Sequence, residues 1–242
     1  DLMVNFILNY LDYLERILVG TQVVDGLRDT GPVQINGLWG AIACVKQTDA
    51  KVNRLVIQSS SSGVQSVKLN ASSPEEFFAP EHLRRIHGLF EYDSMVEFSG
   101  LADLETGVLE YEKHSGASSV FPWGPQVVFH THPCASGAEV YSVTDLFLFA
   151  CAPAWVSLLF SEFRISVLEK QKTETEYFTM LRKKLDYLRS GGYLQKNSRM
   201  NSCYFSSILE RMFPELKSII LHTQRIDFIC KTMSFKLTEY QL

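Results

Sequence analysis

Two histidines separated by one residue carry the clearest chemical signal in the sequence. His130 and His132 end the run VVFHTH over residues 127–132, and its apolar start predicts a buried strand. Residues i and i+2 of a strand point to the same face of a sheet, so both imidazoles would lie on one side and could bind one metal ion. A third ligand from another element would leave a fourth position for water, as in catalytic zinc sites.

A helix start that follows the histidines offers this third ligand. Ser142 is typical of a helix N-cap, and Asp145, three residues later, lies on the same helix face. We therefore expect His130, His132 and Asp145 to bind Zn2+. The alternative is a histidine pair that only makes hydrogen bonds within the fold. The apolar strand, Pro133 and the helix start together favour the metal site.

Other metal proteins with a His-x-His pair fit this sequence less well. Amidohydrolase barrels carry the pair near the N-terminus, whereas only 110 residues (242 minus 132) follow His132, too few for such a barrel. A cupin would use Glu139 and a later histidine, but His222 lies too far along the chain for that motif. A three-histidine site of the carbonic-anhydrase kind lacks its third ligand for the same reason.

The pattern as a whole resembles the JAMM, or MPN-plus, metalloprotease family over about residues 64–170. The residues that carry the resemblance are His130-Thr131-His132-Pro133, similar to the family's His-Ser/Thr-His-Pro, Ser142 to Asp145, similar to its Ser-x-x-Asp, and Glu97, on a strand before Gly100, similar to its upstream acid. One departure is the gap between His132 and Ser142, which holds nine residues where seven is usual. Residues 135–138 account for the excess, and a longer loop costs little as long as its ends still meet.

The resemblance implies an α/β fold of the MPN (JAMM, cytidine-deaminase-like) type, a sheet flanked by helices. It also implies a zinc-dependent isopeptidase that removes ubiquitin or a ubiquitin-like modifier. In that reaction Glu97 acts as general base through a water molecule, and Ser142 donates a hydrogen bond to the developing oxyanion. The rival acids are Glu91, which has no following glycine, Glu105 in a turn, and Glu110 and Glu112, whose alternation is typical of a solvated strand face.

The pattern of the chain predicts the elements that must position these residues. Strands are expected over residues 38–47, 52–58, 64–70, 94–103, 107–114, 125–132, 155–160 and 163–170, and helices over 3–19, 74–89 with a break near Pro80, 142–151, 173–189 and 202–213. This order indicates an α/β sheet. We interpret residues 1–63 as an N-terminal helix and strands belonging with the core, 64–170 as the metalloprotease core, and 171–242 as a helical C-terminal extension.

Composition limits the classes of function. Apolar residues make up 46% of the 242 residues, enough for a sizeable core. The net charge of −4 argues against a nucleic-acid partner, and no apolar run reaches the roughly 18 residues of a membrane span. Five scattered cysteines without a Cys-x-x-Cys pair favour a reducing compartment, and no signal peptide is recognised. We therefore expect an intracellular protein, cytoplasmic or nuclear.

Two further functions remain open on the sequence alone. A protein of this fold can serve as a scaffold or assembly component without catalysis, and a JAMM peptidase can act on an amide other than a ubiquitin conjugate, since fold does not determine substrate. The resemblance implies a ubiquitin or ubiquitin-like conjugate as substrate, and a protein partner could bind through the C-terminal helices.

Overall fold

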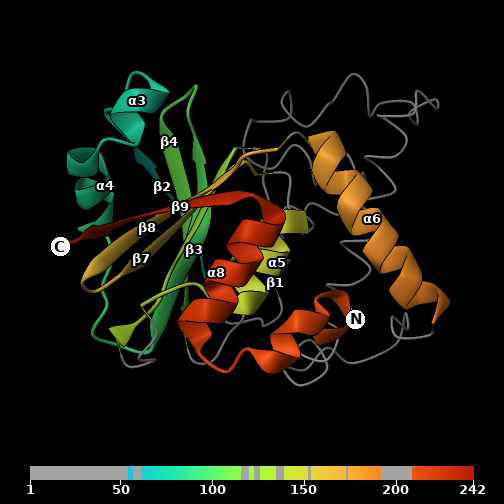
Figure 1. The fold of residues 1–242 in the computed structure, drawn as a ribbon. Helices are drawn as coiled ribbons and strands as arrows, with labels where there is room; N and C mark the ends of the chain where they lie inside the picture. Colours follow the sequence, from blue (N-terminus) through green and yellow to red (C-terminus); the bar gives the residue numbers. More distant parts are fainter. Residues whose placement is uncertain are drawn as a thin grey trace.

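The computed structural model shows a mixed α/β fold built on an open seven-stranded sheet (Figure 1). It describes residues 54–56, 61–115, 120–122, 126–134, 139–151, 154–172, 174–191 and 209–242. The α/β class and the sheet flanked by helices are confirmed. The helix predicted over 3–19 and the strand predicted over 38–47 lie outside the described residues.

The sheet is antiparallel except at its centre. In spatial order its strands are β2 (Ser61–Lys68), β4 (Val108–Ser115), β3 (Val96–Asp103), β6 (Val127–Thr131), β7 (Val156–Ser161), β8 (Arg164–Lys170) and β9 (Phe235–Gln241). Only β6 and β7 are parallel, and parallel neighbours need a crossover connection. Helix α5 (Val143–Cys151) makes this crossover. Two short strands, β1 (Arg54–Val56) and β5 (Val120–Pro122), pair separately.

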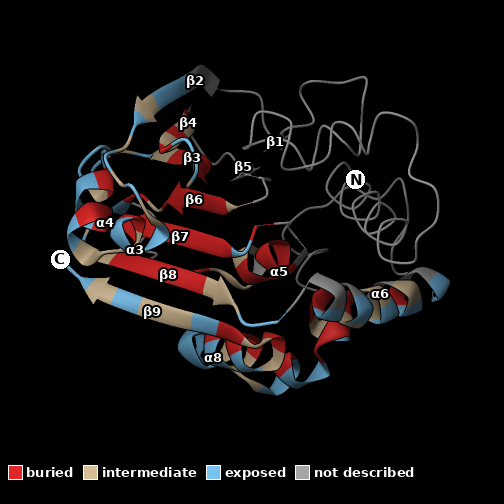
Figure 2. Ribbon diagram, turned by 90° about the horizontal axis from the view of Figure 1, so that it is seen from above, coloured by how far each residue is buried: buried red, intermediate tan, exposed pale blue. Residues whose placement is uncertain are grey.

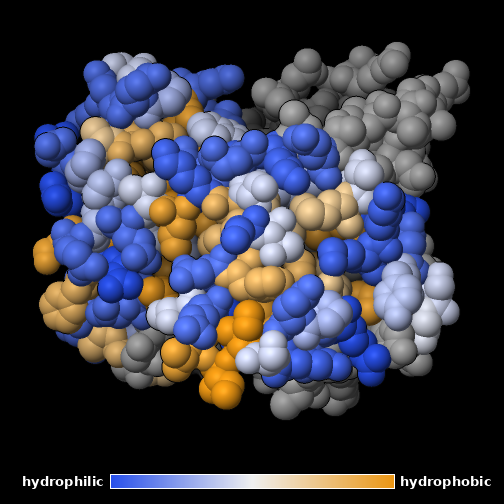
Figure 3. Space-filling model, viewed as in Figure 1, coloured by the Kyte–Doolittle hydropathy of each residue, from blue (hydrophilic) through white to orange (hydrophobic). Residues whose placement is uncertain are grey.

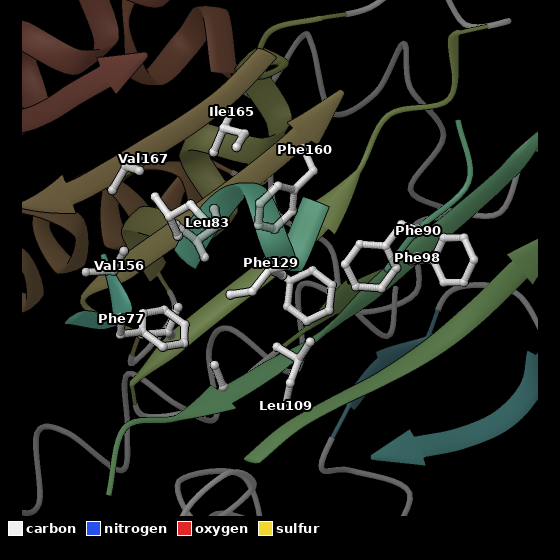
Figure 4. Close-up of a cluster of buried hydrophobic side chains, with 14 of the residues drawn as sticks. Phe77, Leu83, Phe90, Phe98, Leu109, Phe129, Val156, Phe160, Ile165 and Val167 are labelled. Atoms are coloured by element: carbon white, nitrogen blue, oxygen red, sulfur yellow. The ribbon is translucent and has the colours of Figure 1, made fainter. Parts of the chain in front are cut away.

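One face of the sheet packs against α3 (Pro74–Phe77) and α4 (Pro80–His87). The break predicted near Pro80 is confirmed, and the Ser73 side chain caps α3 by accepting from the Glu76 amide. Aromatic rings fill this layer (Figure 4), with the Phe90 and Phe129 centroids 5.3 Å apart. Burial of these side chains, each worth about 1.5–3 kcal/mol, holds the two helices on the sheet.

The other face packs against α5, α6 (Glu174–Ser190) and α8 (His222–Met233), on the opposite side of the sheet from α3 and α4 (Figure 2). Residues 146–150 of helix α5 are all buried. The short helix η3 (Pro214–Ser218) precedes α8. No helix among the described residues has both the length and the apolar character needed to cross a membrane.

The C-terminal segment differs from the helical extension predicted for residues 171–242. It contains the predicted helix over 173–189 as α6, but it ends in β9, which pairs antiparallel with β8. Ser234, in the left-handed region with φ of 53°, ends α8 and turns the chain into this strand. The last strand was not predicted because the register that recruits it to β8 is a long-range contact.

The strand predicted over 94–103 is confirmed as β3, which runs without a turn through Gly100 to Asp103. The glycine serves close packing instead. A Cβ atom at Gly100 would collide with the carbonyl oxygen of Glu110 on β4 and lie 2.8 Å from a ring carbon of Phe129 on β6. A residue without a side chain is required there because both neighbouring strands approach its backbone.

Candidate metal centre

Strand β6 places the two histidines on one face of the sheet. Ser99 on β3 pairs with His130, so their side chains share a face. His132 lies two residues beyond His130 and continues on that face, and its amide donates to the Phe160 carbonyl oxygen at 2.9 Å. This is the face covered by α5, whereas Phe129 and Thr131 point toward α3 and α4. The alternation of the strand alone therefore separates the candidate metal ligands from the aromatic core.

The first turn of α5 brings in Asp145 through a reciprocal cap. The Ser142 amide donates to Asp145 Oδ2 at 2.9 Å, and the Asp145 amide donates to Ser142 Oγ at 3.0 Å. This arrangement is a capping box with aspartate in place of the usual glutamate. The Ser-x-x-Asp spacing thus has a structural role, besides the chemical role expected for it. Because Ser142 Oγ accepts the amide proton, its own hydroxyl proton stays available to a third group.

His130, His132 and Asp145 converge on one point at the C-terminal end of β6. The two Nε2 atoms lie 3.1 Å apart, and Asp145 Oδ2 lies 3.4 Å from Nε2 of His130 and 3.6 Å from Nε2 of His132. One ligand atom from each residue falls within 4.8 Å of the other two. The side chain of His130 is 5% exposed and that of Asp145 is 19% exposed, so the point is sheltered but reachable from solvent.

The electrostatics of the triad match a site for a cation. Burial raises the pKa of Asp145, but His130 and His132 reverse this and hold its pKa well below the ordinary 3.8. Burial likewise lowers the pKa of His130, but Asp145 and then Glu97 outweigh it and raise its pKa above 6.5. The Asp145 carboxylate is therefore ionised, and it favours a positive charge between the three side chains. Without a metal this charge is a proton on an imidazole, and a bound metal ion would replace that proton.

Glu97 lies on the same face of the sheet as the triad. It precedes Ser99 by two residues on β3, and Ser99 is the cross-strand partner of His130. Burial raises the pKa of Glu97 to about 7, an effect that His130 opposes and Asp145 reinforces. A carboxyl group with a pKa near neutrality can both accept and return a proton. The structure thus places the predicted base beside the predicted ligands.

The donor set fits a three-ligand zinc site. Two imidazole nitrogens and one carboxylate oxygen are ligands that zinc takes in its catalytic sites, where the remaining position binds water. Both Nε2 atoms face each other, at 3.1 Å, and Asp145 Oδ2, so the ring nitrogens that could bind a metal ion are turned toward one point. The buried Nδ1 of His132 meets no hydrogen-bond partner among the described residues. A metal ion on Nε2 would place the imidazole proton on this atom.

Comparisons with protein-family models, with curated proteins and with solved structures gave no match. The triad itself is the observation on which a functional conclusion must stand. Three potential ligands from two separate elements, β6 and α5, meet at one point, and this convergence needs the tertiary fold.

The rival acids and the other histidines have different environments. Glu91 pairs with Lys113 at 2.6 Å on the surface. Glu112 was predicted to lie on a solvated face, and this is wrong, because it is buried at 8% exposure. Its cross-strand partner on β3 is Ser99, so among the rival acids it shares the face of the sheet that carries Glu97 and His130. His82 and His87 contact the carbonyl oxygens of Phe77 and Ser161, respectively. These contacts hold both rings within the fold.

Two residues near the centre were missed by sequence reasoning. Ser99, buried opposite His130, shares the strand alternation with Glu97 and could have been found from that period. His222, at the start of α8, donates from Nε2 to the Tyr141 carbonyl oxygen at 3.0 Å. It is 81 residues from Tyr141, so no local pattern could have indicated the contact.

Proposed function

We propose that this chain is a zinc-dependent hydrolase of the JAMM (MPN-plus) type that cleaves an amide or isopeptide bond. His130, His132 and Asp145 would hold the ion, and the convergence of these three residues on one point carries the proposal. A bound zinc ion would act as a Lewis acid on the scissile carbonyl and lower the pKa of water toward about 7.

Glu97 supplies the proton transfers. Its carboxylate accepts a proton from the attacking water as the new C–O bond forms, and it returns that proton to the nitrogen as the C–N bond breaks. The products are a carboxylic acid and an amine. Burial raises the pKa of Glu97 to about 7 in the metal-free protein, which makes the carboxylate more basic, and a bound cation would favour the ionised form that accepts the first proton.

Ser142 stabilises the developing negative charge. Its Oγ already accepts the Asp145 amide, so its remaining hydroxyl proton is free to turn toward a substrate oxygen. A donor of this kind typically contributes about 2.7–4 kcal/mol to the activation free energy. Tyr141, whose hydroxyl donates to the Ser157 carbonyl oxygen at 2.9 Å, anchors the residue before Ser142 to the sheet.

The substrate class comes from the resemblance of the motifs. A ubiquitin or ubiquitin-like conjugate is the substrate we propose, and a non-ubiquitin amide is the alternative within the same chemistry. Support comes from the order of elements around the site, in which an acid on β3, two histidines at the end of β6 and the start of α5 meet on one face of a mixed sheet. That order agrees with an MPN-type fold.

The proposal is tested with the purified chain, zinc and ubiquitin chains of defined linkage. We expect hydrolysis that a zinc chelator abolishes and added zinc restores. Glu97→Gln should lose turnover and keep the metal, whereas His132→Ala should lose both. Glu91→Gln, which removes a surface carboxyl paired with Lys113, is the matched control and should cleave normally.

Two outcomes would count against a zinc isopeptidase. Full activity in Glu97→Gln would remove this residue from the mechanism. A folded protein that binds less than one equivalent of zinc and cleaves no amide would instead favour a scaffold or assembly role. A protein that cleaves other amides but no ubiquitin chain would keep the chemistry and change the substrate.

A further inference from the structure

The N-terminus of α5 is held by a hydrogen bond from a distant part of the chain. His222, the first residue of α8, donates from Nε2 to the carbonyl oxygen of Tyr141 at 3.0 Å. Tyr141 directly precedes Ser142, which caps α5 and takes part in the proposed reaction. The hydrolytic steps proposed above assign no role to this bond from the C-terminal segment.

The Tyr141 carbonyl belongs to the same peptide group as the Ser142 amide. A peptide group is planar, and in the trans form its C=O and N–H bonds point in opposite directions. The part of the chain that the structure describes contains no cis peptide bond. A donor that fixes the direction of the Tyr141 carbonyl therefore also fixes the direction of the Ser142 N–H.

The Ser142 N–H donates to the oxygen atom that faces the imidazoles. Its partner is Asp145 Oδ2 at 2.9 Å, and this oxygen lies within 3.6 Å of both Nε2 atoms of the triad. A series of hydrogen bonds thus leads from His222 through the peptide group to the candidate ligand oxygen. Hydrogen bonds in series polarise one another, and a hydrogen bond to a ligating carboxylate orients the ligand and tunes its affinity for the metal.

Tyr141 is fixed at its side chain as well as at its carbonyl. The side chain is buried, its hydroxyl donates to the Ser157 carbonyl oxygen at 2.9 Å, and its ring centroid lies 6.1 Å from that of His130. With the ring held on the sheet, the freedom that remains is rotation of the peptide group that follows it. The bond from His222 restricts this rotation.

Helix α8 holds His222 in place for this contact. Its side chains at Ile226, Ile229 and Met233 are buried, and the helix contacts α5. Near its start, the Arg225 guanidinium donates to two carbonyl oxygens of the preceding segment at 3.0 and 3.3 Å. Figure 3 shows many hydrophilic side chains on the face of the molecule where α8 lies, as expected for a helix with one side packed and the other in water.

The alternative is a bond that only holds α8 against the domain. A histidine–carbonyl bond of that purely structural kind exists on the other side of the sheet, where His82 Nδ1 donates to the Phe77 carbonyl oxygen at 2.8 Å. Loss of a structural bond lowers stability and leaves the affinity for zinc unchanged. Loss of an orienting bond weakens zinc binding in a protein that is still folded, so the two roles can be separated by measurement.

From this geometry we infer that His222 is a positioning residue of the metal centre. It orients the peptide group between Tyr141 and Ser142, and through that group it orients the Asp145 carboxylate. The role rests on the proposed zinc centre, whereas the hydrogen bonds themselves can be measured in the metal-free protein. The C-terminal segment thereby contributes to the metal centre through α8.

The first test measures zinc affinity by competition with a chromophoric chelator. His222→Ala and His222→Leu both lack the donor, whereas His222→Gln keeps a side-chain N–H, and His82→Ala is the matched control. We expect the zinc Kd to rise about tenfold in the two variants without a donor. It should stay close to the wild-type value in His222→Gln and in His82→Ala, although the control should have a lower melting temperature.

The second test uses the metal-free protein and requires no zinc. Hydrogen exchange of the Ser142 amide, followed by NMR, reports its bond to Asp145 Oδ2. This exchange should become several-fold faster in His222→Ala and return toward the wild-type rate in His222→Gln. The Leu146 amide, which donates to the Ser142 carbonyl oxygen at 3.2 Å within α5, is the internal reference and should exchange at an unchanged rate.

An unchanged zinc Kd or an unchanged Ser142 exchange rate in both variants without a donor would overturn the positioning role. Equal weakening of zinc binding in His82→Ala would also overturn it, because loss of stability would then explain the effect. Zinc binding without cleavage of any amide would refute the hydrolase alone, since the zinc Kd still reports the role of His222. A wild-type protein that binds no zinc would overturn both proposals.

Discussion

The metal-free protein should lose stability as the pH rises through the range in which Glu97 resists ionisation. Burial raises the pKa of Glu97 from 4.5 to about 7, so the folded protein holds this proton more tightly than the unfolded chain. Above pH 4.5 the unfolded chain releases the proton first, and stability falls until about pH 7, where the folded protein also releases it. The difference in pKa corresponds to at most about 3 kcal/mol.

Urea unfolding with a chelator present, from pH 4.5 to 8, measures this effect in wild type and in Glu97→Gln. Between pH 4.5 and 7 the unfolding free energy of wild type should fall relative to that of Glu97→Gln by up to about 3 kcal/mol. Asp145, with its pKa held below 3.8, contributes stability that is already complete in this window, and it is common to both proteins. The unfolding free energy of Glu91→Gln should depend on pH in the same way as that of wild type.

A pH-independent difference, within about 0.5 kcal/mol, would refute the reasoning. It would mean that the Glu97 carboxyl is hydrated in the folded protein and does not hold its proton up to neutral pH, so its pKa would not suit the proposed base. Saturating zinc should flatten the difference, because a cation at the triad favours the ionised carboxylate.

Three further predictions concern the triad, the cap and the sheet. His132→Ala and Asp145→Ala should each bring bound zinc, measured by metal analysis after dialysis, close to zero, and one full equivalent in either variant would contradict the ligand assignment. Ser142→Ala should lower the unfolding free energy by about 1 kcal/mol through loss of the cap and slow turnover by about 10²–10³; a normal kcat would show that its hydroxyl does not meet the oxyanion. Gly100→Ala should destabilise the protein by several kcal/mol in urea, because the new Cβ meets Glu110 and Phe129. Gly88→Ala, where the nearest atoms are 3.5 Å away, should change stability by less than about 1 kcal/mol, and equal effects at both glycines would contradict this account.

Local patterns in the sequence were sufficient for the elements that carry the chemistry. The period of two along β6 placed His130 and His132 on one face, and the three-residue spacing from Ser142 to Asp145 placed both in the first turn of a helix. These are short-range properties of strands and helices, so they hold before the fold is known. The break at Pro80 follows for the same reason, since proline restricts the residue before it.

Other features depended on contacts between distant segments. The antiparallel register of β3 and β6 brings Glu97 to the face of the histidines, and the crossover from β6 through α5 to β7 brings Asp145 Oδ2 within 3.6 Å of both imidazoles. Burial, which raises the pKa of Glu97, arises only from packing of the whole domain.

The sequence by itself determined which side chains share a face, because side-chain direction follows from local backbone geometry. Tertiary structure alone decided which faces meet. Glu112 is buried, although the alternation of acids along its strand had predicted a solvated side chain. Strand β9 pairs with β8 at the edge of the sheet, and His222 forms a hydrogen bond with Tyr141, which is 81 residues away in the sequence. Such contacts arise from long-range strand pairing and helix packing, and no local pattern of residues encodes them.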